Sequence, residues 1–158
     1  MTERDTTIRL VDEPDLTMEA LPLLSDGDAI ELLRRARRIA VIGASSHPWR
    51  ASNSVMRYLL DYGYECVPVT PKRSEVLGRP TYPTLEAAVA ATGPFDIVDV
   101  FRRPEYTPAI ARSAVATGCR ALWLQQGVIN DEAVRIAHDG GLAVVMDRCT
   151  AIVHQHVR

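Results

Sequence analysis

Short apolar runs alternate with helix-like segments five times along this 158-residue chain, and this alternation limits the possible folds more than any other feature. The runs are rich in Val, Ile, Leu and Ala, which is typical of parallel strands buried on both faces. The segments between them have apolar residues at helical spacing, as crossovers between parallel strands require. The predicted strands are residues 39–42, 64–69, 96–101, 120–124 and 142–146. We therefore expect an α/β fold with a five-stranded parallel sheet and helices on both faces.

The helices between these strands have recognisable ends. In the first, acidic residues stand at the start and arginines at the end, which suits the helix dipole. Glycines follow several of the others, as is usual after a helix C-terminus. The predicted helices are residues 26–38, 52–62, 84–91, 104–117 and 130–139, with a last turn or helix within 147–157. Residues 1–25 are polar and acidic and are predicted to form an N-terminal arm, and residues 26–158 a single domain.

Composition argues against several classes of partner. The formal net charge is -2, so neither nucleic acid nor an anionic membrane surface is an expected partner. The N-terminus does not have the pattern of a signal sequence, and no apolar run approaches the length of a membrane span, so we expect a cytoplasmic protein. The three cysteines are widely spaced and the histidines have no ligand-like grouping, so neither a disulfide framework nor a metal site is predicted.

Ligands of open parallel sheets bind beyond the carboxyl ends of the strands, so the residues after each predicted strand carry the functional signal. After the first strand, a glycine and several small or hydroxyl-bearing residues lead into a helix, where free N–H groups and hydroxyls can hold phosphate. Only the first glycine of the G-x-G-x-x-G pattern is present, and an ordinary capped helix start is the alternative. The candidate residues here are Gly43, Ala44, Ser45, Ser46, Arg50 and Ser52.

The second strand is followed by Lys72 and Arg73. NAD-binding folds place an acidic residue near this position to hold the ribose hydroxyls. Two cations favour instead a phosphorylated ribose, as in NADP or coenzyme A (CoA). A basic surface loop is the alternative.

The ends of the third and fourth strands supply further candidates. Val100, Phe101 and Arg102 could flank a nucleotide, or they could be core residues next to an exposed arginine. Gln125 and Gln126 could hydrogen-bond an amide-rich ligand in both directions, or one of them could point to solvent.

No catalytic residue is predicted. Lys72 is the only lysine, and Pro68 stands four residues before it, so the Tyr-x-x-x-Lys pair of short-chain reductases cannot form. The sequence contains neither a G-x-x-x-x-G-K-[ST] loop nor a compelling Ser-His-Asp order. Asp99 lies inside a predicted strand and could be buried or could contact the ligand.

Five stretches carry a resemblance to a known family: IAVIGASSHPWRASNSVMRYLLDYGYECVPVTPK, LGRPTYPTLEAA, DIVDVFR, LWLQQGVIN and GLAVVMDRC. They run in order from Ile39 to Cys149. Together they resemble the small CoA-binding proteins, stand-alone relatives of the CoA-binding domain of the succinyl-CoA synthetase alpha subunit.

The resemblance implies a Rossmann-like fold and bound CoA. By position, residues 44–46 would hold phosphate, and Lys72 and Arg73 would face the CoA phosphates. Residues 100–102 would line the nucleotide cleft, and Gln125 and Gln126 would border the pantetheine arm. Gln126 is neutral where the synthetase has an acidic residue, and the second, phosphohistidine-bearing domain of the synthetase is not expected in this chain.

The leading hypothesis is therefore non-covalent binding of CoA or an acyl-CoA, without catalysis by this chain and with any protein partner unknown. One alternative is an NADP-dependent oxidoreductase, and another is the CoA-binding subunit of a split NDP-forming acyl-CoA synthetase. A third is an interaction domain with a vestigial pocket.

Overall fold

The computed structural model describes residues 20–158. Of the N-terminal arm predicted for residues 1–25, residues 1–19 lie outside the described part and residues 20–25 lie within it. The last part of that range contacts the sheet, where the Leu24 N–H donates a hydrogen bond of 2.9 Å to the carbonyl of Val144.

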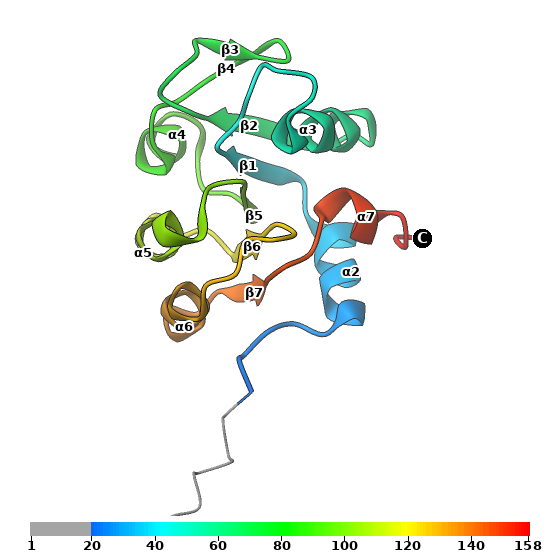
Figure 1. The fold of residues 1–158 in the computed structure, drawn as a ribbon, viewed down its shortest axis with the longest axis vertical. Helices are drawn as coiled ribbons and strands as arrows, with labels where there is room; N and C mark the ends of the chain where they lie inside the picture. The colour runs from blue at the N-terminus through cyan, green and yellow to red at the C-terminus, as the bar shows by residue number, and fades with distance from the viewer. Residues whose placement is uncertain (1–19) are drawn as a thin grey trace, which may run out of the picture.

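Five parallel strands form the central sheet in the order β2-β1-β5-β6-β7 (Figure 1). This confirms the predicted α/β class and its Rossmann-like arrangement. β1 lies between β2 and β5, so that Ala40 is paired with Val67 on one side and Val98 on the other. The strands are β1 Arg38–Ile42, β2 Glu65–Val69, β5 Ile97–Val100, β6 Ala121–Leu124 and β7 Ala143–Val145.

Helices cover both faces of the sheet. The set α4, α5 and α6 lies on one face, and α2, α3 and α7 lie on the other (Figure 1). The helices are α2 Asp26–Arg35, α3 Ala51–Asp61, α4 Leu85–Thr92, α5 Thr107–Ala116, α6 Asp131–Asp139 and α7 Thr150–His154, with a 3₁₀ turn η1 at Pro104–Tyr106. In the described part of the chain, the helices are too short and too polar to span a bilayer.

α2 is shorter than predicted. Ala36 has an extended backbone, and the next two N–H groups, of Arg37 and Arg38, both donate to the Asp96 carboxylate at 2.8 and 2.9 Å. Because Asp96 accepts from both N–H groups, the helix ends before Arg37 and β1 begins at Arg38. The arginine-rich sequence alone had predicted that the helix continues to residue 38.

A small hairpin follows β2 that the sequence analysis did not predict. Its strands are β3 Glu75–Val76 and β4 Arg79–Pro80, and they pair antiparallel. The turn places both Leu77 and Gly78 at positive φ. The hairpin lies at the carboxyl end of β2, beside the edge of the sheet where ligands are expected (Figure 1).

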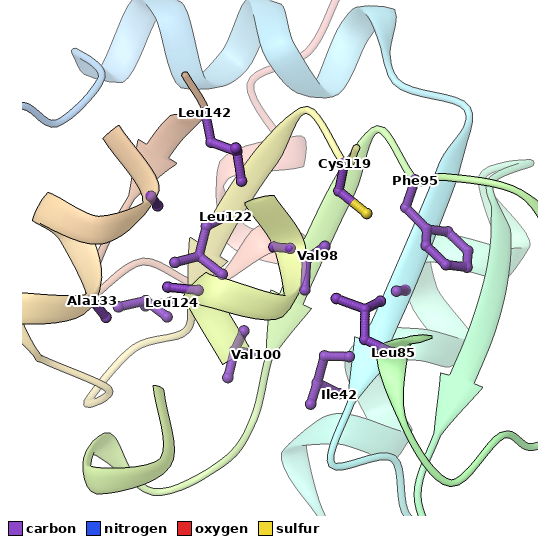
Figure 2. Packing of buried hydrophobic residues seen from close by; sticks show 14 of the residues in the cluster. Ile42, Leu85, Phe95, Val98, Val100, Cys119, Leu122, Leu124, Ala133 and Leu142 are labelled. Carbon is purple, nitrogen blue, oxygen red and sulfur yellow. The ribbon is translucent and has the colours of Figure 1, made fainter. Parts of the chain in front are cut away.

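Two hydrophobic cores fill the spaces on either side of the sheet. On the α4–α6 side, Figure 2 shows Ile42, Val100 and Leu124 pointing from their strands toward side chains of the helices, such as Leu85 and Ala133. On the other side, the largest buried side chain is that of Trp123, whose indole N–H donates to the Arg148 carbonyl at 2.8 Å. The side chains on both faces of the sheet explain why its strands are nearly continuous apolar runs.

α5 and α6 approach one another closely at Gly140. A Cβ at this position would lie 2.4 and 2.6 Å from the two Cγ atoms of Val115. Valine is stiff at χ1, so the contact has little room to relax. We expect Gly140→Ala to lower the free energy of unfolding by about 1–3 kcal/mol in urea denaturation.

Val115→Ala in the same chain should restore most of that loss, because it removes both clashing atoms. Gly27→Ala is the control, since nothing beyond its chain neighbours and the backbone of its own helix lies within 4 Å of a Cβ there. Equal midpoints for Gly140→Ala and the wild type would contradict the predicted close contact.

Candidate functional site

The carboxyl ends of β1, β2 and β5 surround a cleft of ≈ 250 Å³. Ile42 and Val69 line it at the strand ends, and Pro71 lines it after β2. Arg102 and Tyr106 line it after β5, and its remaining lining residues belong to the start of α4 and to α5. The cleft lies at the edge that the sequence analysis selected.

Gly43 brings three strand ends together. It has φ +84°, and its N–H donates to the Val69 carbonyl at 3.0 Å. A Cβ here would lie 3.0 Å from Cδ of Arg102 and 3.2 Å from the carbonyl oxygen of Phe101. Glycine is therefore required both by the backbone conformation and by the close approach of the neighbouring loop.

The rest of the loop between β1 and α3 is held by its own hydrogen bonds. Ser45 Oγ accepts from the N–H of His47 at 3.1 Å, and the Asn53 amide donates to the Ser45 carbonyl at 2.8 Å. The ring of His47 stacks on Trp49 at 4.6 Å between centroids, and Trp49 is 77% exposed. The loop thus has a defined shape with an aromatic side chain at its surface.

The start of α3 offers N–H groups to a ligand. Its N-cap residue, Arg50, makes no side-chain capping hydrogen bond, and the first turn contains no acidic residue. Ser46 and Arg50 are exposed next to it, whereas the side chains of Ala44 and Ser52 are buried. An anion at this end would meet free N–H groups and the positive end of the helix dipole.

Four cationic side chains lie on the loops that follow β1, β2 and β5, and Arg102 is the one of them that lines the cleft: Arg50, Lys72, Arg73 and Arg102. In residues 20–158, none of them has a carboxylate within 4.0 Å. The Arg102 guanidinium lies over the Tyr106 ring at 4.4 Å from its centroid. The cleft wall also contains one acidic residue, Glu86, whose carboxylate accepts from the Ser113 hydroxyl at 2.8 Å.

The candidates after β5 and β6 differ in accessibility. The Val100 side chain is fully buried in the α4–α6 core, and Phe101 packs partly against the opposite core. Gln126 is exposed, whereas Gln125 is only 4% exposed. A ligand could thus meet the backbone of Val100 but not its side chain.

A buried polar network lies next to this edge of the sheet. The Gln125 Nε2 group donates to Asp99 Oδ1 at 2.6 Å and to Thr150 Oγ1 at 2.8 Å. The Thr150 hydroxyl in turn donates to Asp99 Oδ2 at 2.9 Å. Asp99, which the sequence left open between burial and ligand contact, is completely buried. Thr150 was not predicted, since only the register between β5 and β6 and the docking of α7 bring it to Asp99.

Burial dominates the electrostatics of Asp99. Loss of water raises the pKa of this carboxyl from 3.8 to about 7, although the hydrogen bonds from Gln125 and Thr150 partly offset that rise. Within residues 20–158, His, Cys, Asp and Glu form no group of three that could hold a metal ion.

Residues 37–155 match the profile of the CoA binding domain family. The match covers most of the chain, which therefore belongs to this family.

Two relatives are similar to this chain over most of their length. Protein YneT of Bacillus subtilis (strain 168) is 39% identical over 130 residues, which is 82% of this chain and 94% of YneT. A protein of solved structure from Pyrococcus horikoshii OT3 is 38% identical and has a TM-score of 0.79, covering 85% of this chain and 92% of that one.

A more distant likeness concerns the fold alone. The dinucleotide forming acetyl-coenzyme A synthetase 1 of Ca. Korarchaeum cryptofilum is 22% identical with a TM-score of 0.61. The similarity covers 73% of this chain but only 27% of the synthetase.

The buried Asp99 carboxyl predicts a specific pH dependence of stability. Its folded pKa lies above its ordinary value, so the stabilisation is complete below about pH 4 and is lost as the pH rises through about 7. Relative to Asp99→Asn, which has no titrating group at this position, the wild type should lose up to about 4 kcal/mol of unfolding free energy over this range.

Urea denaturation of both proteins from pH 4 to pH 8 measures this difference. Asp61→Asn, which removes an exposed carboxylate at the end of α3, serves as the control. A difference between wild type and Asp99→Asn that stays constant with pH would contradict the prediction.

Proposed function

We propose that this member of the CoA binding domain family binds CoA or an acyl-CoA non-covalently at the carboxyl ends of β1, β2 and β5. The observation that carries the proposal is the family match over residues 37–155, together with a cleft at this edge that Arg102 lines and with three further cations on the loops after β1 and β2. CoA is polyanionic, because it carries a pyrophosphate and a phosphate on its ribose. Its charge is complementary to Arg50, Lys72, Arg73 and Arg102.

The loop between β1 and α3 suits the pyrophosphate. Gly43 lets the backbone turn without a side chain in the way, and the uncapped N-terminus of α3 follows. The backbone N–H groups of residues 45, 46 and 52, with the Ser45 and Ser46 hydroxyls and the Arg50 guanidinium, are the donors in this proposal. The Ala44 N–H instead donates to the Val69 carbonyl at 3.4 Å, so Ala44 would only border the phosphate. The Arg50 side chain makes no capping hydrogen bond at the start of α3.

The cations after β2 suit the phosphate on the ribose. Lys72 and Arg73 are exposed on the loop that leads into the β3–β4 hairpin, where NAD-binding folds have an acidic residue. The ≈ 250 Å³ cleft is smaller than the about 300–1,000 Å³ of typical small-molecule pockets, so it would take one part of CoA and leave the rest along the sheet edge. Phe101 and Arg102, and the backbone of Val100, would border the nucleotide. Gln125 and Gln126 would border the pantetheine arm.

In this proposal the chain binds CoA without chemistry of its own, in the cytoplasm. A second candidate is the CoA-binding part of a split NDP-forming acyl-CoA synthetase. The observation in its favour is the shared fold with one part of an acetyl-coenzyme A synthetase. Co-purification of a second chain that restores ATP- or ADP-dependent acyl-CoA formation would support that candidate over the first.

Isothermal titration with CoA, dephospho-CoA and NADPH tests the proposal. We expect CoA to bind in the micromolar range or tighter, and dephospho-CoA to bind more weakly because it lacks the ribose phosphate. Lys72→Ala should weaken CoA binding about 3- to 10-fold while leaving dephospho-CoA binding nearly unchanged.

Arg135→Ala is the matched control, since it removes an exposed cation of α6 rather than one on the loops that follow β1, β2 and β5. Absence of CoA binding by the wild type would end the proposal. Tighter binding of NADPH than of CoA would instead favour an NADP-dependent oxidoreductase.

A further inference from the structure

The Gln125 side-chain amide is held so that it can accept a hydrogen bond from a ligand but cannot donate one. A side-chain amide has two N–H donors and one acceptor oxygen. The Gln125 Nε2 group meets two internal acceptors, Asp99 Oδ1 at 2.6 Å and Thr150 Oγ1 at 2.8 Å. Both donors are therefore used inside the protein, and Oε1 is the only hydrogen-bonding atom left.

The Oε1 atom of Gln125 is not part of the network and is not completely buried. The residue is 4% exposed, and Oε1 makes no hydrogen bond to residues 20–158. In that part of the chain, the fully buried side-chain atom without a partner is Nη2 of Arg38, so Oε1 is not among the atoms sealed from solvent. Gln125 directly follows β6, so the residue lies at the carboxyl edge of the sheet.

Local backbone contacts keep the amide in this place. The Gln125 N–H donates to the Val100 carbonyl at 3.3 Å, and the Gln125 carbonyl accepts from Val128 at 2.9 Å. The network thus holds the side-chain amide through one atom each of Asp99 and Thr150, while the sheet holds the backbone from which the side chain extends.

We propose that Asp99 and Thr150 are positioning residues, which turn the Gln125 amide so that it offers only an acceptor oxygen to the ligand and selects a ligand group with an N–H donor. This inference rests on the proposed CoA site and deepens it. The pantetheine arm of CoA contains amide N–H groups of this kind, whereas the nucleotide half of CoA lies toward the cations at β1 and β2. The network should therefore affect the arm and not the nucleotide.

The composition of the network supports a role beyond packing. Asp99 occupies the centre of the sheet, where its neighbours in register are Val41 and Trp123. An apolar side chain would fill this position without the cost of removing a carboxyl from water. Thr150 is also the first residue of α7, so the amide is coupled to the docking of this helix.

The test compares binding of CoA and of adenosine 3′,5′-bisphosphate, which contains the nucleotide part and has no pantetheine. Thr150→Val and Asp99→Leu each remove an acceptor for the Gln125 amide, and Gln125→Met removes Oε1 itself. We expect each to weaken CoA binding about 3- to 10-fold, the value of one neutral hydrogen bond, with binding of the bisphosphate unchanged.

Conservative variants supply the matched controls. Thr150→Ser keeps the hydroxyl, and Asp99→Asn keeps one acceptor oxygen for Nε2, so both should bind CoA within about twofold of the wild type. In the Gln125→Met background, Thr150→Val should cause no further loss, because its effect passes through the amide that is already absent.

The outcomes separate the inference from the proposed function. Wild-type affinity for CoA in Thr150→Val, an additive loss in the double variant, or equal loss of both ligands would overturn the inference while CoA binding stands. A wild type that does not bind CoA would defeat the proposed function itself. If Asp99→Leu does not fold, the cycle of Thr150→Val and Gln125→Met decides the question alone.

Discussion

The pairing of β1 with β2 on one side and β5 on the other is the interaction on which the rest of the structure depends. The chain runs from β1 to β2 and then crosses back over β1 to form β5, so the direction of winding reverses between β1 and β5. At such a reversal the two following loops diverge to opposite faces and leave a crevice. The crevice at this edge of the sheet is therefore a result of the strand order, and the side chains only line it.

Several elements contribute different features to the carboxyl edge of the sheet. Gly43 has no side chain at the point where the loops meet, and the side chain of Arg50 leaves the start of α3 uncapped. The cations lie farther out, on loops where water can still reach them, so they need no internal partners. By contrast, the buried carboxyl of Asp99 lies just below the edge and is tolerated because Gln125 and Thr150 satisfy both of its oxygens.

The sequence predicted most of this architecture because its strands are apolar runs and its helices end at glycines or begin at caps. It failed where tertiary contacts overrode the local pattern. α2 ends early since Asp96, distant in sequence, binds the next two N–H groups, and the β3–β4 hairpin is too short and polar to give a period. At the site, the cations and Gly43 could be found from their place after each strand. The role of Thr150 could not, because it depends on the β5–β6 register and on where α7 docks.

The two tryptophans occupy opposite environments, and this difference has an optical consequence. Trp123 is sealed in the core with its indole N–H bound to a carbonyl, whereas Trp49 lies 77% exposed on the loop that leads into α3. The fluorescence of Trp123 should not respond to changes at the surface and should report whether the sheet is folded. Emission from the second senses the solvent around that loop, so the chain carries one intrinsic fluorophore for folding and another for changes at the loop between β1 and α3.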